Sequence, residues 1–82
     1  MIEITHRENG VLFDVVLSND GAITSLTLHH LSGFSANISN EEQMKILDPR
    51  FPLCRFSDSW YTLYPEFVIL IRERRKRLME TR

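Results

Sequence analysis

The chain has 82 residues, of which 43% are apolar and 26% charged, and a net charge of −1. This length fits one small domain, and the composition is typical of a soluble globular protein. No apolar run approaches the roughly 20 residues that a membrane-spanning helix needs, and the N-terminal Met-Ile-Glu-Ile-Thr-His stretch lacks the features of a secretory signal. The single cysteine, Cys54, excludes an internal disulfide and favours a reducing, cytoplasmic setting.

Two turn dipeptides organise the first part of the chain. Asn9-Gly10 and Asp20-Gly21 are both typical of two-residue hairpin turns, because such turns need positive φ at both central residues. We therefore expect an antiparallel β-meander over residues 2–31. Its expected strands are residues 2–7, 11–18 and 22–31, the second of which lies at the centre.

The alternation of side chains supports the register that these two turns impose. Seven apolar residues then share one face of the sheet: Ile2, Ile4, Phe13, Val15, Leu17, Leu26 and Leu28. The opposite face is polar, with Glu3, Thr5, Arg7, Asp14, Ser25 and Thr27, and it also carries the scattered apolar residues Leu12, Val16 and Ile23. A slip of one residue would invert each set, so we expect this register.

The middle of the chain predicts short elements. Residues 34–38 fit either a short fourth strand or a loop. Ser39 and Glu42 form a capping box, which predicts a helix over 40–47. An extended crossover over 48–58 follows, and then a turn of helix over residues 60–63. From the crossover we expect four apolar residues to cover an edge of the core: Phe51, Leu53, Cys54 and Phe56.

Proline at position 65, followed by Glu66, marks the start of a helix over 65–81. Its first two turns are apolar on most sides and should be buried against the sheet. After Ile71 the helix is charged all round, so we expect that half to project into solvent or to meet another molecule. The predicted fold is thus α+β, a single domain over 1–82. It is a three-stranded antiparallel meander, with four strands as the alternative, packed against the C-terminal helix, with one short additional helix.

Charge is divided unevenly along the chain. Residues 1–54 carry three basic against seven acidic residues, and residues 55–82 carry seven against four. Five of the basic residues fall within one run: Arg72, Arg74, Arg75, Lys76 and Arg77. Such a run suits a nucleic-acid phosphate backbone, but it also suits a solvated helix end or a protein contact, because helix C-termini favour cations.

Three aromatic residues precede the C-terminal helix: Trp60, Tyr61 and Tyr64. Tyrosine and tryptophan are common anchors of protein interfaces. They also close cores while their polar tips reach the surface. We expect at least one of the three to be structural and the others to be candidates for a protein interface.

No combination of residues in the sequence predicts a catalytic, metal-binding or cofactor-binding site. His29 and His30 point to opposite faces of the expected sheet, so they cannot chelate one ion, and His6 lies near one sheet end. The serines and threonines lack the context of a nucleophile elbow or a P-loop. We therefore expect no catalytic residue, no metal and no cofactor.

These observations predict a small, non-enzymatic protein–protein interaction module that binds another protein or itself. A homodimer is expected to be accessible, because both outer strands of a small sheet are edges that invite pairing. Short single-domain chains of this kind suggest an accessory or inhibitor protein of a bacterium or phage. The alternative is a nucleic-acid-binding protein that uses the basic helix.

Overall fold

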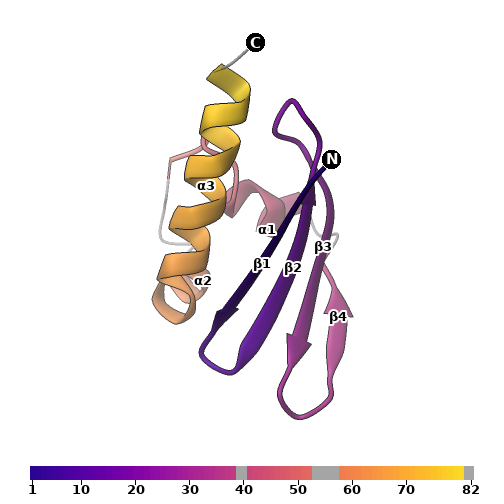
Figure 1. Ribbon diagram of the computed structural model, residues 1–82. Coiled ribbons are helices and arrows are strands. Elements are labelled where there is room, and N and C mark those ends of the chain that lie inside the picture. Colours follow the sequence, from indigo (N-terminus) through magenta and orange to yellow (C-terminus); the bar gives the residue numbers. More distant parts are fainter. Residues whose placement is uncertain (39–40, 53–57, 81–82) are drawn as a thin grey trace.

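The computed structural model describes residues 1–38, 41–52 and 58–80, and within them it shows a four-stranded antiparallel sheet with helices on one side (Figure 1). The strands are β1 (Ile2–Glu8), β2 (Val11–Leu17), β3 (Ile23–His30) and β4 (Ser35–Asn37), and they lie in the sheet in that order. The helices are α1 (Glu41–Ile46), α2 (Asp58–Leu63) and α3 (Pro65–Glu80). The predicted α+β fold is confirmed, and residues 34–38 contribute the fourth strand.

The first hairpin has the predicted turn and register. Asn9 and Gly10 have φ of 49° and 75°, as a two-residue turn of this kind requires. Every expected pair between β1 and β2 is present, from Ile2 opposite Leu17 to Arg7 opposite Leu12.

The second hairpin differs from the prediction at its turn. Leu17 pairs with Ile23 instead of with Thr24, because a bulge interrupts the register between Val16 and Leu17. Ser18 donates to the carbonyl of Ala22 at 2.8 Å, so the loop has three residues and only its last, Gly21 (φ 92°), has positive φ. The expected Ser18–Ile23 and Leu17–Thr24 pairs are therefore wrong. The bulge moves Ile23 from the outer face to the core face, where it packs against the buried cluster.

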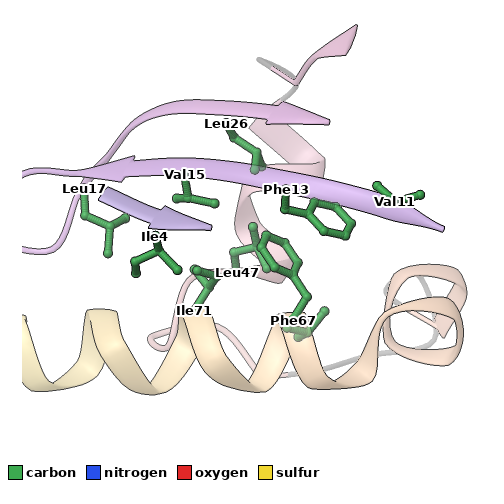
Figure 2. Packing of buried hydrophobic residues seen from close by; sticks show 10 residues of the cluster. Ile4, Val11, Phe13, Val15, Leu17, Leu26, Leu47, Phe67 and Ile71 are labelled. Carbon is green, nitrogen blue, oxygen red and sulfur yellow. The ribbon is translucent and has the colours of Figure 1, made fainter. Parts of the chain in front are cut away.

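One core fills the space between the sheet and α3 (Figure 2). Side chains of β2 point toward α3, and Phe67 and Ile71 of α3 point back toward them. Phe13 and Phe67 stack face to face, with ring centroids 3.9 Å apart and planes 14° from parallel. The buried apolar residues are Ile4, Val11, Phe13, Val15, Leu17, Leu26, Leu47, Phe67, Val68 and Ile71.

Each expectation about the two halves of α3 holds only in part, since Phe67, Val68 and Ile71 are buried as expected and Arg74, Lys76 and Arg77 are exposed as expected. In the apolar half, Ile69 and Leu70 remain 43% and 37% exposed, because only one side of the helix meets the sheet. In the charged half, Arg75 is buried and Leu78 packs against the core. The β2–β3 loop approaches this half so closely that a Cβ on Gly21 would lie 3.0 Å from the Arg75 carbonyl oxygen.

Of the four crossover residues expected to cover an edge of the core, Phe51 is the one within the described residues. Phe51 is 42% exposed and does not cover the core. Leu53, Cys54, Phe56 and the Ser39 cap lie outside the described residues, and so does the side chain of Glu42. None of the helices in the described ranges is long and apolar enough to cross a membrane.

Candidate protein interface

The structure separates the three candidate aromatic residues. Trp60 and Tyr64 are half-buried and pack on Phe13, with ring centroids 6.1 and 5.0 Å away. They also contact each other, at 5.9 Å, so they close the end of the core. Tyr61 is 41% exposed. Of the three, Tyr61 therefore keeps the most surface for a partner.

Two exposed leucines flank the turn between β1 and β2. The Asn9 side-chain amide donates to the Leu63 carbonyl at the end of α2. On the other side of the turn, the Leu31 amide donates to the Gly10 carbonyl at 3.1 Å. Leu31 and Leu63 are 78% and 52% exposed. The turn thus bonds to the backbone of two exposed leucines that are 32 positions apart in the chain.

The neighbouring β3–β4 turn adds a third large apolar residue. His30 donates to the carbonyl of Phe34 at 2.7 Å, and the Phe34 ring is 61% exposed. In Figure 1 both hairpin turns and α2 lie at the same end of the molecule. We call this surface, formed by Leu31, Phe34, Tyr61 and Leu63, the apolar end. Exposed apolar residues gathered in this way are typical of interaction sites.

Sequence reasoning missed three of these four residues. Leu31 and Phe34 flank Ser32-Gly33, a polar turn, and Leu63 follows the aromatic pair. The available signal was a large apolar residue on each side of a turn, where polar residues are the rule.

The basic run of α3 is divided between internal and exposed residues. Arg72 donates to three backbone carbonyls at the end of α1 and in the segment after it, those of Ile46, Asp48 and Phe51, at 2.7–2.9 Å. Arg75 donates to the carbonyls of Gly21 and Leu47, both at 2.7 Å. These two arginines therefore join α3 to the segment after α1, and Arg75 also joins it to the β2–β3 loop. The exposed members of the run are Arg74, Lys76 and Arg77.

A buried carboxylate completes this junction. Asp48 accepts two hydrogen bonds from the Arg50 guanidinium, at 3.0 and 2.7 Å, and one from the Arg50 amide at 2.9 Å. These bonds lower the pKa of Asp48 against the opposing effect of burial, and the Arg75 guanidinium, 3.9 Å away, lowers it further. Burial lowers the pKa of Arg75, and the Asp48 charge opposes that effect. Because the pKa of Asp48 is lower when folded, its stabilising contribution is present above the unfolded pKa of about 3.9 and is lost as the pH falls through the folded value.

A chain of polar contacts crosses the outer face of the sheet, with one residue from each of the four described strands. Thr5 donates to Asp14 at 3.3 Å, Asp14 contacts Nε2 of His29 at 3.0 Å, and Nδ1 of His29 contacts Ser35 at 2.8 Å. Serine, histidine and aspartate in this order resemble a hydrolytic triad. The His29 and Asp14 side chains are 41% and 46% exposed, however, so water competes for every contact. The contact between His29 and Ser35 joins the short β4 to β3.

Glu8, at the end of β1, caps α3. Its carboxylate accepts the amides of Glu66 and Phe67 at 3.3 and 2.9 Å, and His6 contacts it at 3.0 Å. Ligand atoms of His6, Glu8 and Glu66 lie within 4.8 Å of one another, which is compatible with a metal site. Both Glu8 oxygens are already bonded to helix amides, though, and the positive end of the helix dipole disfavours a cation. The arrangement is therefore a helix cap.

Replacing Glu8 by alanine should destabilise the protein by about 0.5–2 kcal/mol, because two amides at the start of α3 lose their acceptor. Urea unfolding followed by circular dichroism would measure this change. Glu8→Gln keeps one acceptor oxygen and should lose less. Equal losses for the two variants would show that the carboxylate acts by charge alone.

Comparison of the chain with protein-family models, with curated proteins and with solved structures found no match.

Proposed function

We propose that this protein is a non-enzymatic module that binds another protein through the apolar end. The observation that supports this function most directly is the exposure of Leu31, Phe34, Tyr61 and Leu63, between 41% and 78%, around two adjoining turns. Burying large apolar side chains is the main source of affinity at protein interfaces, since complete transfer of a leucine or phenylalanine side chain from water contributes about 1.5–3 kcal/mol.

The apolar end is also held firmly enough to present a defined surface. Trp60 and Tyr64 anchor α2 on Phe13, and the Asn9 side chain ties the end of α2 to the first hairpin turn. A surface that is ordered before binding loses less conformational entropy when a partner arrives. Tyr61, which projects beside this anchor, is the type of residue that frequently carries binding energy.

The test is quantitative affinity purification of partners from a lysate of the source organism. The double change Leu31→Ser and Leu63→Ser should remove a specific partner, because two apolar contacts at the centre of the surface are lost. Ile69→Ser alters an apolar residue on α3 that is 43% exposed and lies outside the apolar end, so it should leave the partner bound. Unfolding midpoints of both variants would confirm that the fold is intact. Retention of the same partners by the double variant would contradict the proposal.

The alternative function, nucleic-acid binding by the basic helix, has less support. Two of its five residues, Arg72 and Arg75, have their guanidinium donors on backbone carbonyls. Arg74, Lys76 and Arg77 remain exposed. Fluorescence anisotropy with labelled oligonucleotides would favour this alternative if binding occurred in low salt and weakened steeply as salt was added.

A further inference from the structure

The free edge of β1 is the longest unpaired strand edge among the described residues. β1 stands at one end of the sheet order and has seven residues, whereas β4, at the other end, has three. In Figure 1, β1 borders the sheet on the side of α3. Natural proteins shorten, charge or cover such edges because they pair readily with a further strand.

The first hairpin determines which backbone groups this edge presents. A two-residue turn makes Glu8 and Val11 a hydrogen-bonded pair, and such pairs then alternate along the strands. The amides and carbonyls of Glu3, Thr5 and Arg7 therefore point outward. The same alternation, continued across the sheet, predicts bonds from β3 toward β4 at Leu26 and His30. Both are present, from Ile38 to the Leu26 carbonyl at 2.9 Å and from His30 to the Phe34 carbonyl at 2.7 Å.

The three outward-facing residues are complementary to a second copy of themselves. In an antiparallel pair centred on Thr5, the two Thr5 residues face each other, and Glu3 of each copy lies opposite Arg7 of the other. Opposite charges and threonine pairs directly across two strands both stabilise a sheet. Parallel pairing in register would place Glu3 beside Glu3 and Arg7 beside Arg7. An antiparallel register shifted by one pair would no longer place Glu3 of one copy opposite Arg7 of the other. Among the described residues, neither Glu3 nor Arg7 has an ion-pair partner within its own chain.

A row of residues on α3 shows a similar self-complementary charge pattern, and its centre is level with Thr5 of β1. β1 and α3 run in opposite directions, because Glu8 caps the start of α3 while Ile4 lies near Ile71 in the core (Figure 2). The His6 ring stacks on Phe67, with centroids 5.9 Å apart. Thr5 is therefore level with the second turn of α3, where Leu70 is 37% exposed.

Leu70 lies on the side of α3 that borders the free edge. Arg72 reaches the segment after α1, which lines a hollow together with Ile23 of β3. An α-helix turns about 100° per residue, so Leu70 is about 200° from Arg72, on the opposite flank. Glu66 and Arg74, four residues before and after Leu70, share its row and are exposed.

We propose that two copies of this chain associate about a two-fold axis at Thr5, so that the two sheets become one continuous sheet. The same axis places the two α3 helices side by side and antiparallel on one face. Leu70 then meets Leu70 of the second copy, and Glu66 faces Arg74 of the second copy. The charges of β1 and those of α3 are thus each self-complementary about the same two-fold axis. The edge lies apart from the apolar end, so this inference does not depend on the proposed function.

Sedimentation equilibrium of the full chain tests the proposal, and the expected mass is twice the 9.7 kDa of one chain. Glu3→Arg puts arginine opposite Arg7 and Arg7→Glu puts glutamate opposite Glu3, so each single variant should weaken association at least tenfold. The double variant Glu3→Arg/Arg7→Glu exchanges the two charges and should dimerise again. A mixture of the two single variants should form heterodimers.

A monomeric wild-type chain at about 100 μM protein, where most specific dimers are populated, would overturn the proposal. Dimeric single variants would also overturn it, because pairing would then not use these charges. The Leu31→Ser/Leu63→Ser variant should remain dimeric while losing its partner. The Glu3 and Arg7 variants test dimerisation through β1, and the Leu31→Ser/Leu63→Ser variant tests partner binding through the apolar end. The two proposals can therefore fail independently.

Discussion

Replacing Arg75 by methionine should destabilise the protein by about 2–5 kcal/mol, because the buried carbonyls of Gly21 and Leu47 lose their donor. Asp48 also loses one of its two cationic neighbours. For a domain of this size each kcal/mol lowers the melting temperature by about 4–8 °C, so we expect a loss of at least about 8 °C. Differential scanning calorimetry would measure it.

Two further variants separate the causes of this loss. Arg75→Lys keeps the charge near Asp48 but cannot donate along two fixed directions, so most of the destabilisation should remain. Lys76→Met, at the adjacent exposed position, should change stability by no more than about 0.5 kcal/mol. If Arg75→Lys behaved like the wild type, the charge and not the hydrogen-bond geometry would be the important property.

Replacing Phe67 by alanine should cost about 3–5 kcal/mol, which is the usual cost of deleting a buried aromatic ring. Phe67 is fully buried and packs on Phe13, His6 and Trp60, so its removal opens a cavity at the centre of the aromatic cluster. Small domains have only about 5–15 kcal/mol of stability, so a large part of it would be lost. Chemical denaturation followed by Trp60 fluorescence would report both the stability and the environment of that ring.

Two further variants serve as controls for Phe67→Ala. One is a conservative substitution at the same position, and the other replaces an exposed residue of α3. Phe67→Leu retains most of the apolar volume and should lose about half as much as the alanine variant. Ile69→Ala, two residues along α3 on the exposed side, should be nearly neutral. A large loss for Ile69→Ala would indicate that this side of α3 is covered by another molecule.

Turn residues explain how much of the sheet could be predicted. Asn9-Gly10 allowed a single interpretation, and every pair of that hairpin is as expected. Asn19-Asp20-Gly21 fits a two-residue turn and also a three-residue loop in which only the glycine has positive φ. The choice between the two depends on where Ile23 can pack, and that position is determined by the core.

The positions of charged residues could not be read from α3 alone. The helix pattern shows an apolar stripe that Arg74 and Arg75 interrupt, but gives no reason for one to be buried and the other exposed. Arg75 is buried because carbonyls 54 and 28 positions away meet its guanidinium. The apolar end was missed for a related reason, since the exposure of Leu31 and Leu63 depends on where two turns and a helix converge.

The links between α3 and the rest of the chain have a consequence for folding kinetics. The cap from Glu8 and the bonds of Arg75 close loops of 58, 54 and 28 positions, whereas both principal hairpins join neighbouring strands. Closing long loops costs more entropy, so the meander should form first and α3 should dock last. Interactions that form after the transition state slow unfolding and barely change the folding rate. We therefore expect the contacts of Arg75 and Glu8 to determine the unfolding rate, and the two hairpin turns to determine the folding rate.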